Sequence, residues 1–348
     1  MAPLVSVVLD TYNHERFIEE AIQSALGQDF PAADMEILVV DDGSTDRTPE
    51  IARKFEPHVK LLRKPNGGQA SAINYGIAHA KGEFVAFLDG DDVWLPNKLS
   101  RVVAEFEKRP EPVLVYHRFE YWDPQDGSVW HPTHFRNVSG DILGDRSKLL
   151  AYSAAPTSSL AFRRSVLMRL VPVPEQCSFN HDAYLISNAI FLGPVAAVTE
   201  CLTRYRIHGQ NLYSARGQLD VKALQRRLEV RAATIEAIRA WTRRNAPKRA
   251  RPQARLVTRK WCLIQAEDEF LLQPPGRLRF FAHRVRQNLT YGSQMTRAHL
   301  TYRWVHAFAE LIVGNKVHYL EGLRTRARKL KSRVAGTKHA SEAGGPAL

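Results

Sequence analysis

The chain has 348 residues, of which 44% are hydrophobic, and it carries a formal net charge of +13. This length suffices for one domain with a large core plus an appendage. No stretch has the length and apolarity of a membrane span, and no basic segment precedes an apolar one at the start, so we expect neither a transmembrane helix nor a secretory signal. Cys177, Cys201 and Cys262 are scattered, which excludes a recognisable metal-ligand spacing and fits a reducing compartment.

The positive charge is concentrated at the C-terminal end. Residues 219–348 contain 27 Lys and Arg against 9 Asp and Glu, a surplus of 18, which leaves −5 for residues 1–218. Such a shift in charge predicts a boundary near residues 212–220. We therefore predict an N-terminal domain over residues 1–218, a basic helical region over 219–335 and a disordered tail of small and polar residues over 336–348.

The first hundred residues alternate between two kinds of pattern. Short apolar runs predict buried strands, and stretches with apolar residues at helical spacing predict the helices between them. The predicted strands cover residues 5–9, 36–40, 59–62 and 84–88, and the predicted helices cover residues 15–26, 51–55 and 70–80. This alternation predicts an α/β fold with a mostly parallel, doubly wound sheet and right-handed crossovers.

Polar loops follow three of these strands, at residues 10–15, 41–46 and 89–92. Because the carboxyl ends of parallel strands meet at one edge of a sheet, these loops should share one crevice, where open sheets bind ligands. A nucleotide suits such a crevice, since carboxylates can accept hydrogen bonds from a ribose or a uracil-like base. Neither a Gly-x-Gly-x-x-Gly motif nor a P-loop motif is present, which disfavours a dinucleotide-dependent dehydrogenase and a P-loop enzyme.

Three carboxylates stand within four residues after the strand at 84–88: Asp89, Asp91 and Asp92. Their mutual repulsion is tolerable if a hard divalent cation such as Mg²⁺ or Mn²⁺ binds among them, together with substrate phosphates. The alternative is an acidic turn in which Asp91 or Asp92 caps a helix that opens at Pro96. The residues alone leave both interpretations open.

Four segments together resemble family 2 glycosyltransferases, which have the GT-A fold: Val5–Asn13, Val39–Asp46, Asn66–Gly68 and Phe87–Asp92. The resemblance covers residues 4–212 and includes the order and spacing of the segments. It implies inverting transfer of a sugar from a nucleotide-diphosphate sugar, with a UDP-sugar favoured, assisted by Mn²⁺ or Mg²⁺. The nucleotide-sugar half should occupy about residues 1–100 and the acceptor half about residues 101–218.

The resemblance also implies roles for individual residues. The first nucleotide-binding loop contains Thr11, Tyr12 and Glu15. The position that binds the base or ribose is occupied by Asp41 and Asp42. The Asp-x-Asp pair is formed by Asp89, nearer the ribose, and Asp91, the metal ligand. Asp92 is either a second ligand or a helix cap. The chain departs from the family pattern at Asp10, where Pro is usual, and at Ile73, where many members have Arg before the residue equivalent to Asn74.

The acceptor half begins with a strand predicted at residues 113–116. The segment Phe119–Phe135 is rich in aromatic residues and His, which indicates either stacking on a sugar or a packed β-hairpin. The segment Pro156–Arg164 resembles the family's strand beneath the acceptor site.

Asp182 opens a predicted helix, so by itself it could be an ordinary carboxylate at a helix N-terminus. The family places its general base at this position, after Glu or Asn, where this chain has His181. The segment Arg204–Leu212 contains cations that could face a leaving diphosphate, and the resemblance implies a diphosphate or metal role for His208 and, less strongly, for Arg206.

The basic region predicts helices around residues 224–238, 261–272 and 303–312, with a break at Pro247–Pro252. A basic helical surface can bind an anionic membrane or a lipid-linked acceptor, and the alternative is a solvated bundle. No nucleic-acid motif is present, so we expect no nucleic-acid partner.

The sequence thus predicts a cytoplasmic enzyme, with peripheral attachment to the inner face of the membrane as an option. It would transfer sugar to a glycan or a lipid-linked acceptor in surface polysaccharide or glycoconjugate synthesis. The alternative from another class is a non-catalytic nucleotide-sugar-binding protein on the same fold.

Overall fold

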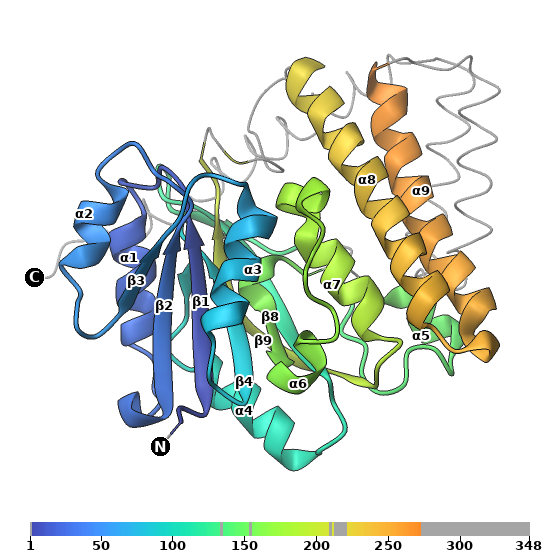
Figure 1. The fold of residues 1–348 in the computed structure, drawn as a ribbon, viewed down its shortest axis with the longest axis horizontal. Coiled ribbons are helices and arrows are strands. Elements are labelled where there is room, and N and C mark those ends of the chain that lie inside the picture. The colour runs from blue at the N-terminus through green and yellow to red at the C-terminus, as the bar shows by residue number, and fades with distance from the viewer. Residues whose placement is uncertain (1, 133–134, 153–154, 209–210, 212–220, 273–348) are drawn as a thin grey trace, which may run out of the picture. The chain divides into compact units, whose positions relative to one another are not determined.

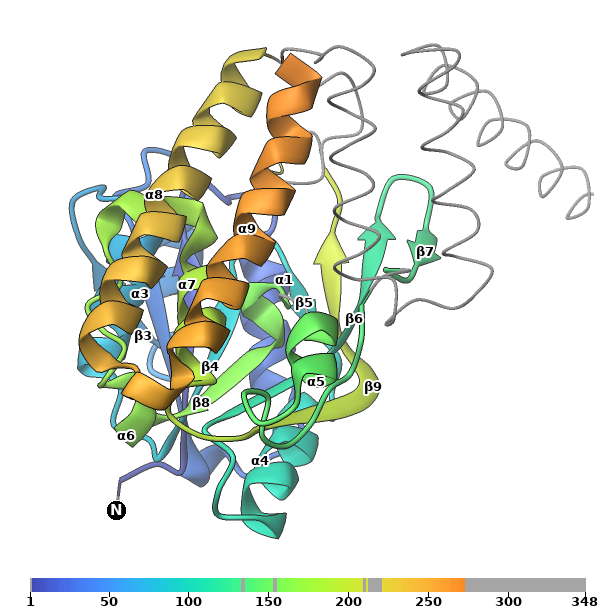
Figure 2. The same cartoon turned by 90° about the vertical axis from the view of Figure 1, so that its right-hand side faces the viewer.

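The computed structural model describes residues 2–132, 135–152, 155–208, 211 and 221–272 (Figures 1 and 2). The chain divides into two compact units, residues 1–272 and 273–348, and the described helices and strands all belong to the first unit. The helix predicted at residues 303–312, the predicted tail and the predicted boundary at 212–220 lie outside the described residues.

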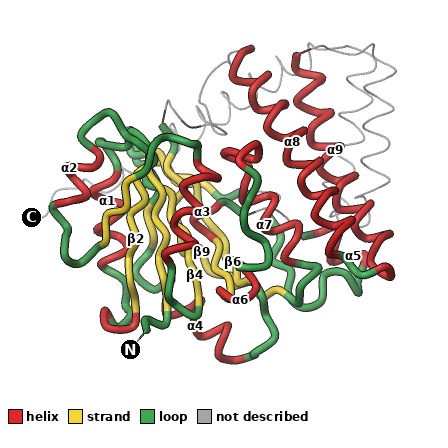
Figure 3. Tube along the Cα trace, viewed as in Figure 1, coloured by secondary structure: helices red, strands yellow, loops and turns green. Residues whose placement is uncertain are grey.

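One sheet of nine strands runs through the first unit in the order β3-β2-β1-β4-β8-β6-β9-β5, with β7 paired to β6. Figure 3 shows the strands of this sheet in yellow, with helices in red around them. The strands are β1 Val5–Thr11, β2 Met35–Asp41, β3 Lys60–Arg63, β4 Phe84–Asp89, β5 Val93–Trp94, β6 Leu114–Asp123, β7 Ser128–Trp130, β8 Leu160–Arg163 and β9 Val195–Arg206. The strands β1 to β4 are mutually parallel, as predicted, and β6 is parallel to β9. Three strands run antiparallel to their neighbours: β8 lies between β4 and β6, β5 pairs with β9, and β7 pairs with β6.

Helices cover the sheet on both faces. They are α1 Ile18–Leu26, α2 Thr48–Arg53, α3 Gln69–His79, α4 Lys98–Lys108, α5 Arg146–Ala151, α6 Arg164–Leu167, α7 His181–Ala189, α8 Val221–Asn245 and α9 Arg251–Leu272. Short 3₁₀ helices add η1 Ala32–Asp34, η2 Thr157–Ser159, η3 Glu175–Asn180 and η4 Lys248–Ala250. Because side chains alternate along a strand, Val7 and Leu9 of β1 join one core with α1, while Val8 joins the other with α3. The mixed α/β architecture expected from the alternating patterns is confirmed.

The segment after β4 differs from the prediction. The next helix does not open at Pro96 but begins at Lys98, and its N-cap is Asn97, so neither Asp91 nor Asp92 caps it. The physical reason is that Val93 and Trp94 form the strand β5 on β9, and the backbone N–H of Leu95 donates to Leu202. The chain therefore stays extended for longer than the apolar pattern indicated.

The helices α8 and α9 belong to the same compact unit as the sheet. Ile238 and Trp241 of α8 and Val257 of α9 are buried in the larger of the two cores, next to residues of α7. The chain breaks between the two helices at Pro247, as predicted. Within the described part of the chain, no helix is both long enough and apolar enough to cross a bilayer.

Candidate active site

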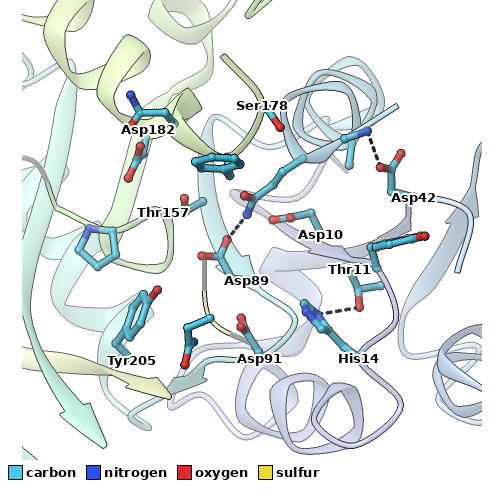
Figure 4. Close-up of a pocket in the computed structure, with 18 of the residues that line it drawn as sticks. Asp10, Thr11, His14, Asp42, Asp89, Asp91, Thr157, Ser178, Asp182 and Tyr205 are labelled. Atoms are coloured by element: carbon cyan, nitrogen blue, oxygen red, sulfur yellow. Dashed lines mark hydrogen bonds between the residues drawn. The ribbon is translucent and has the colours of Figure 1, made fainter. Parts of the chain in front are cut away.

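A pocket of about 670 Å³ opens where β1 and β4 end. One side is lined by Thr11, Tyr12 and Asp42, the middle by Asp89 and Asp91, and the other side by aromatic residues and Asp182. Figure 4 shows this order, with Asp42 and Asp182 on opposite sides of Asp89. The sheet therefore brings together residues as far apart in the sequence as Thr11 and Asp182.

Of the predicted site residues, Thr11, Tyr12, Asp42, Asp89, Asp91, Asp182 and His208 line the pocket. Glu15 and Asp41 do not. The carboxylate of Glu15 lies at the surface and accepts a hydrogen bond from Nε of Arg47 at 3.2 Å. Asp41 is fully buried and accepts from Nε of Arg63 at 2.8 Å and from the backbone of Ser44 at 3.1 Å. Both carboxylates hold loops of the scaffold together.

Asp42 organises the loop on its side of the pocket. Its carboxylate accepts from the backbone N–H groups of Gly67 and Gly68, at 3.1 and 2.7 Å, and from Nζ of Lys64 at 2.6 Å. Gly43 has a φ of +77°, and a Cβ there would lie 2.7 Å from the backbone nitrogen of Asn66. The close approach of these two loops explains why glycines stand at both of them.

The first loop is tied to the second by side chains. The backbone N–H of Asn13 donates to Oγ of Ser44 at 2.9 Å, and Oδ1 of Asn13 accepts from the backbone of Thr45 at 2.8 Å. This arrangement leaves the ring of Tyr12, which is 44% exposed, at the wall of the pocket. A flat, accessible ring of this kind can stack on a nucleotide base.

Asp92 anchors the acidic turn. It is buried, and its two carboxylate oxygens accept from Oγ of Ser158 at 2.6 Å and from the backbone of Arg206 at 3.0 Å. Arg206 is also buried: its Nε donates to the carbonyl of Asp91 at 2.7 Å, and its guanidinium pairs with Glu20. Arg206 is not among the residues that line the pocket, and its contacts support the acidic turn.

Asp91 and His208 meet in the pocket, with Nε2 of His208 3.0 Å from a carboxylate oxygen of Asp91. Burial acts to raise the pKa of Asp91, but His14 and His208 outweigh it and lower that pKa. Burial and the neighbouring carboxylates raise the pKa of Asp89 well above its usual value. Carboxylate oxygens of Asp89, Asp91 and Asp92 lie within 4.8 Å of one another, so the site concentrates negative charge that a hard cation would neutralise.

Asp10 adds a fourth carboxylate to this centre. Burial raises its pKa to about 7, and its Oδ1 makes no hydrogen bond among the described residues. Its neighbour Asp89 accepts a hydrogen bond from the amide of Gln69 at 3.0 Å. Asp10, which stands where the family usually has Pro, therefore lies inside the site and contributes to its electrostatics.

Asp182 lies in the first turn of α7 and accepts a hydrogen bond from the backbone of Ala183 at 2.6 Å. Burial raises the pKa of Asp182 to about 7. A carboxylate with such a pKa gains and loses a proton near neutral pH, as a general base requires. The position at a helix start explains the hydrogen bond of Asp182 to the backbone. It does not explain why Asp182 lines the pocket or why its pKa is raised.

His181 is buried beneath this turn. Its Nε2 lies 3.1 Å from Oγ1 of Thr157 and its Nδ1 lies 3.2 Å from the carbonyl of Ser178. Burial lowers the pKa of His181 to about 4, so the imidazole is neutral at physiological pH. His181 joins the turn that carries Asp182 to the segment before β8.

The aromatic residues of β6 and β7 form a packed hairpin, which is one of the two expectations for this segment. Tyr121 stacks on Trp130 of β7 with ring centroids 5.5 Å apart, and it meets Phe119 and Tyr205 edge-to-face at 5.3 and 5.6 Å. Three of these rings, those of Phe119, Tyr121 and Tyr205, also line the pocket. The hairpin is packed and also forms a wall of the site.

Several residues of the pocket were not predicted from the sequence. They include His14, Gln69, Ser178, Tyr205 and Trp261. Tyr205 could have been found from strand alternation, since it pairs with Tyr121 across β6 and β9. Trp261 lies on α9, far along the chain, and nothing in its local sequence indicates that it reaches the pocket.

Solved structures that are similar in fold include that of residues 1–349 of Staphylococcus aureus TarS in complex with UDP-GlcNAc. It has a TM-score of 0.59 at 19% identity, and the match covers 89% of this chain and 81% of that one. The fold, with its curled central sheet and the acidic turn at its edge, is thus that of the GT-A class of glycosyltransferases.

Similarity in sequence defines the family more narrowly. The profile of glycosyl transferase family 2 matches residues 6–171. An uncharacterized glycosyltransferase of Nostoc sp. is 37% identical over 217 residues, which is 60% of this chain and 66% of that protein. One of Rickettsia typhi is 31% identical over 221 residues, 63% of this chain and 69% of that protein. The chain belongs to glycosyltransferase family 2.

Proposed function

We propose that this chain transfers a sugar, with inversion, from a nucleotide-diphosphate sugar to a hydroxyl group of a glycan or a lipid-linked acceptor. One observation carries the proposal. A single pocket has an acidic, histidine-paired centre at Asp91 and His208 and, on its far side, a carboxylate at Asp182 with a pKa of about 7.

The donor would bind on the side of Tyr12 and Asp42. The ring of Tyr12 offers a stacking surface for the base, and the loop held by Asp42 encloses it. TarS, which shares the fold, has been solved in complex with UDP and with UDP-GlcNAc, and this supports a UDP-sugar as the favoured donor.

The residues around Asp91 fit Mn²⁺ or Mg²⁺. Asp91 and His208 would hold the ion, with Asp89 beside them. Oxygen ligands suit both ions, and an imidazole nitrogen suits Mn²⁺ better than Mg²⁺. When bound, the ion would neutralise charge on the diphosphate. Asp92 is better explained as an anchor, since both of its oxygens already accept hydrogen bonds from the scaffold.

Asp182 would act as the general base. As the acceptor oxygen forms its bond to the anomeric carbon, Asp182 takes the hydroxyl proton, and the bond from that carbon to the diphosphate oxygen breaks on the opposite side. Attack opposite the leaving group inverts the configuration. The aromatic wall of Phe119, Tyr121 and Tyr205 would hold the acceptor ring and limit the access of water.

The test combines binding with turnover. Nucleotide sugars are screened for thermal stabilisation of the protein with Mn²⁺, with Mg²⁺ and with chelator, because a ligand that binds only the folded state raises its melting temperature. The donor found in this way is then incubated with a panel of glycan and lipid-linked acceptors. Metal-dependent stabilisation by one donor together with glycoside formation supports the proposal.

Stabilisation without any transfer or donor hydrolysis would support the rival function, a non-catalytic nucleotide-sugar-binding protein. The pKa of Asp182 argues against that rival, because binding of a donor on the other side of the pocket has no use for a carboxylate that titrates near neutrality. A place in surface polysaccharide or glycoconjugate synthesis at the cytoplasmic face of a membrane fits the proposed acceptors and the basic C-terminal region.

A further inference from the structure

We propose that the chain has a second metal site, a Zn²⁺ site formed by Glu120, His131 and Cys201, on the face of the sheet that points away from the pocket. Each of the three offers one ligand atom, and the three atoms lie within 4.8 Å of one another. The site is independent of the proposed transfer reaction.

Neighbouring strands bring the three residues together. β6 and β7 pair antiparallel with Tyr121 opposite Trp130, which places Glu120 opposite His131 one step along the same register. β6 and β9 pair in parallel, with Glu120 beside Arg204. The side chains of β6 alternate between faces, so Glu120 points away from the pocket that Phe119 and Tyr121 line.

A bulge in β9 places the cysteine. Cys201 and Arg204 are three positions apart, so in a regular strand their side chains would point to opposite faces. The register with β6 shifts between Arg118 and Phe119, and Cys201 thereby stands opposite Arg118, on the face of Glu120. Bulges commonly re-aim one side chain in this way. His131 and Cys201 are 70 residues apart in the sequence, so the sequence alone did not predict that they lie close together.

The distance between the sulfur and nitrogen ligand atoms fits a tetrahedral ion. Sγ of Cys201 lies 3.6 Å from Nδ1 of His131. Typical zinc bonds to sulfur and nitrogen, at a tetrahedral angle, separate the two ligand atoms by about 3.6 Å. A hydrogen bond from the thiol to the imidazole has a similar length and is the alternative that the experiment must exclude.

The ligand types favour zinc over the hard cations of the donor site. A thiolate and an imidazole with one carboxylate suit Zn²⁺ and are poor ligands for Mg²⁺. Nε of Arg204 donates to one oxygen of Glu120 at 2.9 Å, which orients the carboxylate and leaves its second oxygen for the ion. Zn²⁺ binds the thiolate form of cysteine, so binding would release the thiol proton and would weaken at low pH.

Such a site would join the end of β7 to β9 across β6. The opposite face of β6 carries Phe119 and Tyr121, and Tyr121 stacks on Trp130, the neighbour of His131. A metal at Glu120 would therefore hold the aromatic wall of the pocket in place without touching a substrate.

The experiment uses Co²⁺ as a spectroscopic probe on the full chain, stripped of metal with a chelator and kept reduced. A thiolate bound to Co²⁺ gives a charge-transfer band in the near ultraviolet, whereas the donor site has no sulfur ligand. We expect the band to saturate as Co²⁺ is added and to disappear on addition of Zn²⁺. Cys201→Ser should abolish it, and His131→Ala should weaken Co²⁺ binding by at least about tenfold.

Two controls make the assignment specific. Cys262→Ser removes a cysteine outside the cluster and should leave the band unchanged, and Asp91→Ala removes the proposed donor-site ligand and should also leave it unchanged. Circular dichroism of each variant confirms that it is folded. A wild-type chain that gives no band would overturn the proposal and leave a thiol–imidazole hydrogen bond, and a band that survives in folded Cys201→Ser would overturn it as well.

Discussion

Asp182 is the residue on which the proposed chemistry depends most directly. Asp182→Asn keeps the size of the side chain but removes its capacity to take a proton, so transfer should fall by about 10²–10⁴-fold. Donor affinity should stay nearly constant, because Asp182 lies on the side of the pocket away from Asp42. A transfer assay and isothermal titration with the nucleotide sugar measure the two effects.

Asp34→Asn is a suitable control for this substitution, since Asp34 is exposed and lies outside the pocket. If Asp182→Asn transfers sugar at the wild-type rate, Asp182 is only a carboxylate at a helix start and is not the base. His181 could then be tested as the base, although its buried imidazole is held by Thr157 and Ser178.

The pKa of Asp182 predicts a pH dependence. Since burial raises this pKa to about 7, the base is protonated and inactive in acid, and kcat/KM should rise with pH and level off above about pH 7. A profile measured from about pH 5.5 to 8.5 with saturating metal checks this. The acid limb should be absent from the residual activity of Asp182→Asn, and an identical limb in that variant would assign the titration to another group.

The raised pKa has an opposite consequence for stability. The unfolded chain has the ordinary value of 3.8, so between that pH and about 7 the folded state holds a proton that the unfolded state releases. This contribution to stability is therefore complete below pH 3.8 and is lost as the pH rises through the folded-state pKa of about 7. Activity and stability should accordingly shift in opposite directions over this range.

Asp91 is the residue whose removal tests the donor metal. Asp91→Ala should abolish the Mn²⁺- or Mg²⁺-dependent part of nucleotide-diphosphate binding while the fold persists. A ligand present at 100 times its Kd stabilises the folded state by about 2.7 kcal/mol, and that metal-dependent gain should vanish from thermal unfolding curves. Unchanged metal-dependent affinity for UDP in a folded variant would contradict the assignment, and Asp34→Ala serves as the control.

Among the elements, α8 contributes to the hydrophobic core, although its composition is basic. Trp241 is buried, its indole N–H donates to the carbonyl of Arg169 at 3.4 Å, and its ring lies 6.4 Å from that of Phe191. We expect Trp241→Ala to reduce the free energy of unfolding by about 3–5 kcal/mol, as for other large-to-small core substitutions. Chemical denaturation measures this loss.

Glu229→Ala is the matched substitution on the exposed side of the same helix. Its effect should stay within about 0.5 kcal/mol. Equal effects of the two substitutions would mean that α8 is only peripherally attached. A truncation after residue 218 is a poor test of membrane binding for the same reason, since it would expose the core that α8 and α9 cover.

At the scale of the whole molecule, the charge asymmetry predicts interaction with anionic surfaces. Residues 219–348 have a surplus of 18 positive charges, whereas residues 1–218 carry −5. The full chain should sediment with vesicles that contain phosphatidylglycerol, and sedimentation should decrease as salt is added, because ions screen exposed charges. Equal sedimentation with neutral and anionic vesicles at every salt concentration would contradict this.

The sequence by itself was sufficient for the nucleotide half of the fold. The strands β1, β2 and β4 are short apolar runs, and polar residues follow each of them directly, so local pattern and topology agree. The prediction that Asp42, Asp89, Asp91 and Asp182 share one crevice follows from the parallel order and from the family resemblance, and all four line the pocket. Such residues can be predicted because their positions depend on where a strand or helix ends.

Tertiary structure decided what depends on partners distant in sequence. Asp41 and Asp42 are adjacent carboxylates, yet only Asp42 lines the pocket, because Arg63 and Ser44 bind Asp41. Asp92 is an anchor because η2 brings Ser158 to it and β9 brings Arg206 to it. A sequence pattern records which face or end of an element a residue occupies, whereas the role of a buried charge is set by the groups that neutralise it, and these come from strands and helices that only the folded chain brings together.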